Sequence, residues 1–212
     1  MSNDQVFWNK LAKRYAAAPI RDEAAYEQTL SRVRAYLEPS HRVLELGAGT
    51  GSTAVKLAGL VKSICASDLS SEMLEIAKER AKGLDNVTVA VGAVEHAPDG
   101  PFDVVMAMNL FHLLPDLEAA LEAASQRVAE DGLFISKTPC MSDMKAWKWR
   151  LMLLALPLLR LVGKAPSVVR SYSVAEMDAA VARAGFDIVE TGNFPADPPS
   201  RFIVARKRSL VD

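Results

Sequence analysis

Histidine and cysteine are scarce in this chain of 212 residues, which contains three histidines and two cysteines. Cys65 and Cys140 form no Cys-x-x-Cys motif, and only His41, His96 and His112 accompany them. These residues offer no spacing typical of a zinc site. We therefore expect no metal cofactor, and we expect reduced thiols of the kind found in the cytoplasm.

The chain also lacks an excess of charge and a targeting segment. Its net charge is −1, whereas binding to nucleic acid as the main partner would need a basic surface. The first residues, MSNDQVFWNK, show no basic region followed by a long apolar core, so we expect no signal peptide and a cytoplasmic location. The length and the 50% hydrophobic content suit one domain, residues 1–212, with a real core.

Short apolar segments alternate with segments of helical pattern along the chain. The sequence predicts strands at 42–46, 63–67, 86–91, 102–108, 133–137, 186–190 and 201–206, and helices at 23–38, 53–60, 70–82, 116–130 and from Ser173 to Gly185. Proline marks an expected loop at 195–199. Strands separated by helices of this length are typical of βαβ units, so we expect an α/β protein with a mostly parallel sheet.

A glycine-rich stretch, Glu45-Leu-Gly-Ala-Gly-Thr-Gly51, follows the first predicted strand. Glycine allows positive φ and lets a ligand lie directly against the backbone, and the helix that follows presents unpaired N–H groups. A tight strand-to-helix turn would need one glycine, whereas three glycines with an acid in front indicate a ligand-binding loop.

The spacing and the acid narrow the choice of ligand. No lysine follows the glycines as in a P-loop, and Ser52 stands where the dinucleotide fingerprint needs its third glycine. Glu45 would repel a pyrophosphate and attract a cation. S-adenosylmethionine fits, because it carries a sulfonium and an α-ammonium group and no phosphate.

Four motifs together resemble the class I S-adenosylmethionine-dependent methyltransferases, in particular the small-molecule group that includes quinone and sterol methylases. They are VLELGAGTG, SDLSSEML at 67–74, FDVV at 102–105 with HLLPD at 112–116, and VAEDGL at 128–133. The resemblance implies a Rossmann-like, doubly wound, seven-stranded sheet with an antiparallel C-terminal strand. It also implies a helical cap at 1–38 and a lid-like insertion at 138–172.

The resemblance further implies which residues bind S-adenosylmethionine and hold the product S-adenosylhomocysteine. Asp68 would accept hydrogen bonds from the ribose hydroxyls, although it could instead cap the next helix. Leu69 and Met73 would flank the adenine, or face the core. The remaining expected donor contacts are Tyr15 on the leading helix, Glu45, Gly47, Ala48, Gly49, Gly51 and Asn109. Ala93 and Val94 stand where relatives carry an acid, so there we expect backbone contacts to adenine.

The acceptor side is less determined. His112 is a candidate general base, with packing or capping of the next helix as the alternative. Phe111 and Trp147 are candidate acceptor contacts. Methyl transfer needs no base when the acceptor is already nucleophilic, because the sulfonium is itself activated.

Residues 144–175 combine six basic residues with no acid, and 151–162 is strongly apolar. That apolar run is too short and too charged to span a bilayer. Three interpretations are open: a lid over an apolar acceptor, a helix pair that packs on the core or on a second copy of the chain, and a peripheral membrane anchor at the inner face, with 145–170 as the contact.

The sequence thus predicts a methyltransferase that acts on a small, lipophilic acceptor. The alternatives are a membrane phospholipid methyltransferase and a catalytically silent module that binds S-adenosylmethionine and regulates a partner.

Overall fold

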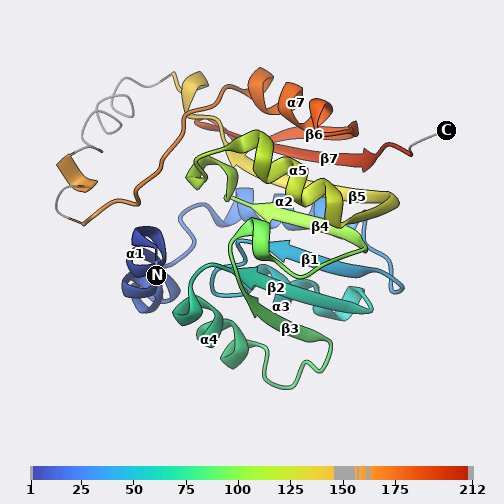
Figure 1. Cartoon of the computed structure of the whole chain (residues 1–212), viewed down its shortest axis with the longest axis horizontal. Coiled ribbons are helices and arrows are strands. Elements are labelled where there is room, and N and C mark those ends of the chain that lie inside the picture. The colour runs from blue at the N-terminus through green and yellow to red at the C-terminus, as the bar shows by residue number, and fades with distance from the viewer. Residues whose placement is uncertain (1, 146–155, 157, 161–162, 210–212) are drawn as a thin grey trace.

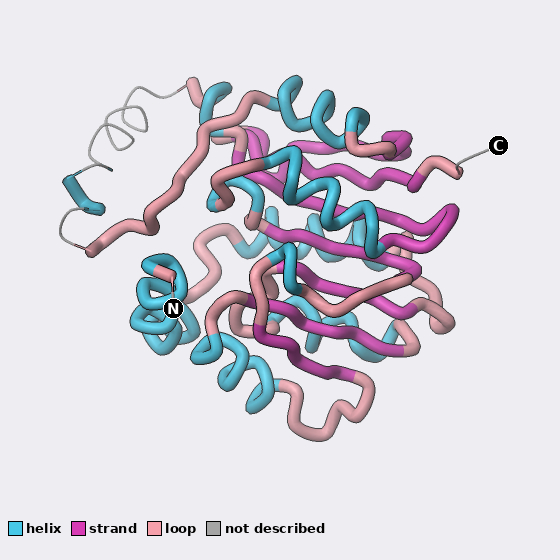
Figure 2. Tube along the Cα trace, viewed as in Figure 1, coloured by secondary structure: helices cyan, strands magenta, loops and turns pink. Residues whose placement is uncertain are grey.

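A computed structural model describes residues 2–145, 156, 158–160 and 163–209. Its centre is a seven-stranded sheet with helices on both faces (Figures 1 and 2). The strands are β1 (Arg42–Leu46), β2 (Ser63–Asp68), β3 (Val87–Val91), β4 (Phe102–Met108), β5 (Val128–Pro139), β6 (Phe186–Ala196) and β7 (Pro199–Lys207). The helices are α1 (Asn3–Ala17), α2 (Glu23–Arg34), α3 (Ser52–Leu57), α4 (Ser71–Arg80), α5 (Leu117–Arg127) and α7 (Val174–Arg183).

The strand order is β3-β2-β1-β4-β5-β7-β6. Strands β1 to β5 pair in parallel, and β7 is antiparallel to both of its neighbours. This confirms the Rossmann-like, doubly wound sheet with an antiparallel C-terminal strand. The strand order reverses between β1 and β4, and open α/β sheets bind ligands outside the carboxyl ends of the strands at such a point.

Each face of the sheet has its own hydrophobic cluster. Leu30 and Val33 of α2 and Leu57 of α3 pack on one face, beside Ile135 and Val204. On the other face, residues of α5 and α7 surround Phe134, whose ring stacks on Phe186 at a centroid distance of 4.9 Å. Because side chains alternate between faces along a strand, Glu45, Met108 and Lys137 belong to the α2 face.

Side-chain caps begin most of the helices that the structure describes. Asp22 Oδ1 accepts from the Ala25 N–H, and the Ser70 hydroxyl accepts from the Met73 N–H. Ser173 and Glu176 form a capping box at the start of α7. Because Ser70 caps α4, Asp68 is not the cap of this helix.

Several predicted boundaries are wrong, among them the end of the strand expected at 186–190, which continues to Ala196 as β6. Helix α2 ends at Arg34, not 38, and α5 ends at Arg127, not 130. Val128 already pairs with Phe102, so 128–130 belongs to β5 and the chain bends there, with Asp131 at φ 56°. The expected loop at 195–199 is a tight hairpin, in which Ala196 pairs with Pro199.

The helical cap over the site at 1–38 and the lid-like insertion at 138–172 stay predictions. Helix α1 itself is bonded to the rest of the protein. Asn9 Oδ1 accepts from the Ser70 hydroxyl at 2.7 Å, which ties α1 to the start of α4. Figure 1 shows α1 and the chain that leads to α7 at the same end of the sheet. Most of 146–162, Trp147 included, lies outside the described residues.

Candidate functional site

A cavity of about 650 Å³ opens at the carboxyl end of β1, where the strand order reverses. This volume is within the range of small-molecule sites. Tyr15, Glu45, Gly47, Ala48, Gly49 and Asn109, all predicted donor contacts, line it. Residues of α2 and the ends of β4 and β5 form another part of the wall, including Tyr26, Thr29, Leu30, Val33, Met108 and Lys137. The chain that follows α1, the start of α3 and Arg80 of α4 complete it.

The glycine loop has the conformation that the sequence predicts. Gly47, Gly49 and Gly51 have φ values of 64°, 55° and 71°. A Cβ atom on Gly49 would meet no protein atom within 4 Å, whereas one on Gly51 would lie 2.7 Å from the Ala77 Cβ. Gly49 therefore leaves space for a ligand, and Gly51 allows α3 and α4 to pack closely.

Glu45 is the buried acid of this cavity, with 2% of its surface exposed. Its Oε2 has no hydrogen-bond partner among the described residues. Burial raises the pKa of Glu45 to about 8, partly offset by hydrogen bonds from the Ala54 backbone and the Thr53 side chain. A buried carboxyl group with an unused oxygen is suited to a ligand that brings a cation.

Asp68, at the end of β2, supports the glycine loop from the side. Its Oδ2 accepts from the Gly49 N–H and its Oδ1 from the Ser70 N–H, both at 2.8 Å. Burial raises the pKa of Asp68, and these backbone hydrogen bonds oppose that effect. A carboxylate has about four acceptor positions, so the hydrogen bonds leave room for ligand hydroxyls.

Other predicted site residues lie away from this cavity wall. Gly51, Asp68, Leu69, Ala93 and His112 do not line it. The side chains of Met73, Val94 and Phe111 are in the interior, with 2%, 6% and 0% of their surface exposed. Their proposed contacts with adenine or acceptor stay predictions.

His112 is half-buried beside the end of β4, and its Nδ1 has no partner among the residues described. Burial lowers the pKa of His112 to about 4. The imidazole is therefore neutral near pH 7 and is a weak base. Its role as a general base stays a prediction.

Sequence reasoning missed Lys137 and Tyr26, two polar residues of the cavity wall. Lys137 is only 8% exposed, and its Nζ donates to the Thr29 hydroxyl at 3.1 Å. The Tyr26 hydroxyl is buried and has no partner in the described part of the chain. The lysine at the end of the mostly apolar predicted strand LFISK was the available signal for Lys137.

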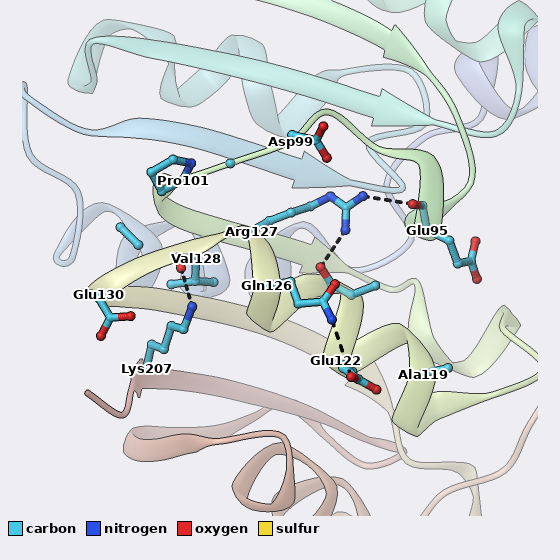
Figure 3. Close-up of a pocket in the computed structure, with 13 residues that line it drawn as sticks. Glu95, Asp99, Pro101, Ala119, Glu122, Gln126, Arg127, Val128, Glu130 and Lys207 are labelled. Atoms are coloured by element: carbon cyan, nitrogen blue, oxygen red, sulfur yellow. Dashed lines mark hydrogen bonds between the residues drawn. The ribbon is translucent and has the colours of Figure 1, made fainter. Parts of the chain in front are cut away.

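A second cavity, of about 870 Å³, lies at the opposite edge, where β4 and β5 begin. Arg127 is one of its lining residues, and Figure 3 shows this side chain extending from the end of α5 toward Glu95. The guanidinium donates to the backbone carbonyls of Glu95, Ala97, Pro98 and Ala123. Since its donors are used by the backbone, we interpret Arg127 as a structural residue.

Replacement of Arg127 by methionine should lower the free energy of unfolding by about 3 kcal/mol, because buried carbonyls lose their donors. Urea denaturation measures this loss. The control is Arg183→Met, which breaks an exposed ion pair with Glu118 and should cost at most about 1 kcal/mol. Equal effects of the two replacements would contradict the structural role of Arg127.

Comparison with known proteins gives three concordant results. A family model described as a methyltransferase domain matches residues 16–191. Malonyl-[acyl-carrier protein] O-methyltransferase of Geobacter sulfurreducens is 35% identical over 161 residues, 73% of this chain and 58% of the relative. Magnesium-protoporphyrin O-methyltransferase of Rhodobacter capsulatus is 30% identical over 112 residues, 51% of this chain and 50% of the relative. The chain thus spans little more than half the length of these curated relatives.

Among solved structures, the complex of DhpI with SAH superposes with a TM-score of 0.76 at 22% identity, over 97% of this chain and 96% of that one. YcgJ from Bacillus subtilis superposes with a TM-score of 0.69 at 22% identity, over 86% and 99% of the two chains. These likenesses show the fold.

Proposed function

Because the chain belongs to the S-adenosylmethionine-dependent methyltransferase family, we propose that it transfers the donor's methyl group to a small acceptor with an apolar part. The observation that carries this proposal is the glycine loop at the switch point beside Glu45, a buried acid with an unused oxygen. Two relatives named as O-methyltransferases favour oxygen as the atom that is methylated.

The residues present suit this donor. Glu45 would hold the α-ammonium group, Gly49 would let the donor lie against the backbone, and Asp68 would accept from the ribose hydroxyls. When bound, S-adenosylmethionine supplies a methyl group already activated by the positive sulfur. The chain's own contribution is alignment and exclusion of water, and Leu30, Val33 and Met108 give the cavity an apolar wall.

The other expectations keep the status of proposals. Within the described ranges no helix is long and apolar enough to cross a membrane. A lid, a contact between two copies and a membrane anchor remain the three roles proposed for 145–170. Trp147 as an acceptor contact lies outside the described residues.

Replacement of Asp68 by alanine should lower the affinity for S-adenosylhomocysteine at least about tenfold, because hydrogen bonds to a charged group contribute about 1.5–3 kcal/mol each. The loop also loses its support, so stability should fall as well. Calorimetric titration and thermal denaturation measure the two effects.

Asp103→Ala is a matched control, because Asp103 also accepts a backbone N–H, that of Arg42 at 2.7 Å, but lies at the opposite edge of the sheet. This variant should lose stability and keep its affinity for the donor product. If the two variants bind equally well, Asp68 does not contact the donor.

Transfer itself is tested with a methyl-labelled donor and a library of small apolar acceptors that carry hydroxyl, carboxyl or amino groups. Label in an extracted product, together with S-adenosylhomocysteine, supports the enzyme. Donor binding without transfer to any acceptor supports the silent regulatory module instead.

A further inference from the structure

Lys137 is a buried cation that forms no ion pair with any residue the structure describes. The ion pairs of the described residues do not include it, and its hydrogen-bond partner is the neutral hydroxyl of Thr29. An ammonium group has three N–H donors, so two of them have no partner in the described part of the chain. Buried ammonium groups are normally paired, because an isolated charge is costly in the interior.

The neighbours of Lys137 position its ammonium group but do not neutralise its charge. The Thr29 hydroxyl donates to the Ala25 carbonyl at 2.7 Å, which leaves a lone pair of its oxygen for Lys137. Asp22 is the acid that acts on Lys137 electrostatically, but its Oδ1 caps α2 by accepting from the Ala25 N–H. Burial lowers the pKa of Lys137, which an anion beside the ammonium group would reverse.

A second unused donor lines the same cavity. The Tyr26 hydroxyl is buried without a partner among the described residues, and Tyr26 and Thr29 are three residues apart on α2, on neighbouring positions of one helix face. Two residues that line one cavity and carry unused donors, one of them charged, suit an anion. Leu30, Val33 and Met108 in the wall suit an apolar chain attached to it.

Lys137 is separate from the expected place of the donor's ammonium group. Glu45 is on β1 and Lys137 is on β5, with β4 between them in the sheet. Adjacent strands are about 4.8 Å apart, so the two backbones are separated by about 10 Å. Arg21 and Arg80 also line this cavity, but Arg21 is exposed and the Arg80 guanidinium donates to Thr50, Ser52 and the Ala16 carbonyl. Lys137 is the buried base at the β5 end, away from the acid at the glycine loop.

We propose that Lys137, assisted by Tyr26, binds the carboxylate of the acceptor, so that the enzyme selects apolar acceptors that carry a carboxylate group. This inference rests on the proposed function and specifies its acceptor class. Thr29 positions the ammonium group. A carboxylate is already deprotonated near pH 7, so it needs no general base to act as an acceptor. This agrees with the lowered pKa of His112, which makes that imidazole a weak base.

The test uses the full chain saturated with S-adenosylhomocysteine. Straight-chain carboxylates from acetate to decanoate are titrated, each against the amide of equal length, by calorimetry. The wild type should bind the best carboxylate at least about tenfold more tightly than its amide, since hydrogen bonds to charged groups are the stronger ones. Lys137→Met should remove this preference and leave the amide's affinity unchanged, and Tyr26→Phe should reduce the preference.

The controls separate the possible failures. Lys62→Met, which changes an exposed lysine at the start of β2, should behave as the wild type. Failure of the wild type to bind S-adenosylhomocysteine would overturn the proposed function itself. Normal binding of that product with no preference for any carboxylate would overturn only the inference about Lys137. A loss of S-adenosylhomocysteine affinity in Lys137→Met as large as the loss for carboxylates would assign Lys137 to the donor's own carboxylate and overturn the acceptor role.

Discussion

Replacement of Glu45 by glutamine is expected to stabilise the donor-free protein at pH 9 and to weaken donor binding. The pKa of Glu45 is about 8, against an ordinary value of 4.5. At about 1.36 kcal/mol per pKa unit, this difference corresponds to a free energy of unfolding about 5 kcal/mol higher in the variant at high pH. Glutamine has nearly the same volume and carries no charge to bury.

The effect depends on pH in a defined direction. Between pH 4.5 and 8 the folded protein holds a proton on Glu45 that the unfolded chain releases, so the stability of the wild type falls as the pH rises. Above pH 8 the folded protein buries a charged carboxylate and the whole cost is present. The gain from Glu45→Gln should therefore be largest at pH 9 and should shrink toward pH 5. Urea denaturation at several pH values measures it.

Glu45→Gln should weaken donor binding although it raises stability. The ionised carboxylate can pair with the α-ammonium group of S-adenosylhomocysteine, so the variant should bind this product at least about tenfold more weakly at pH 8.5. A residue that lowers stability and raises affinity is characteristic of a functional site.

A paired acid provides the contrast to Glu45. Glu190 accepts hydrogen bonds from Arg32 and Tyr36, and these lower its pKa. Glu190→Gln should therefore destabilise the protein and leave donor affinity unchanged. If Glu45→Gln also destabilised the protein at pH 9, Glu45 would have a structural partner and its assignment to the donor would be wrong.

The sequence predicts those parts of the fold and site that depend on neighbouring residues. The glycine loop can be predicted because positive φ at three positions is a local requirement. The start of α4 can be predicted because the Ser70 side chain lies within one turn of the N–H group from which it accepts a hydrogen bond. The end of α5 was predicted wrongly because the pairing of Val128 with Phe102, in another strand, decides it.

The pairing of Tyr26 with Lys137 in the proposed anion site has no local signature. Tyr26 and Lys137 are 111 positions apart, and only the packing of α2 on β5 brings both into one cavity wall. Likewise, the motif position of Met73 left contact with adenine and a place in the core both open, and the side chain is 2% exposed. Sequence patterns identify the ligand loop, whereas the sheet determines which distant side chains surround the ligand.

Two neighbouring glycines allow a matched test of the loop. Gly49→Ala and Gly51→Ala place the same methyl group at positive φ, which costs each variant about 1–2 kcal/mol of backbone strain. In Gly51→Ala the new Cβ also collides with Ala77, so this variant should lose further stability and show a lower melting temperature.

In Gly49→Ala the new methyl group meets no protein atom and enters the cavity instead. Overpacking of a close contact costs about 1–3 kcal/mol, so S-adenosylhomocysteine affinity should fall by about tenfold to a hundredfold, and Gly49→Val should abolish binding. Calorimetry at a temperature where both alanine variants are folded separates the two effects. Because the added group and the backbone strain are the same, a larger loss of affinity in Gly49→Ala than in Gly51→Ala can come only from the space that the donor occupies. Equal affinities would place the donor elsewhere than against Gly49.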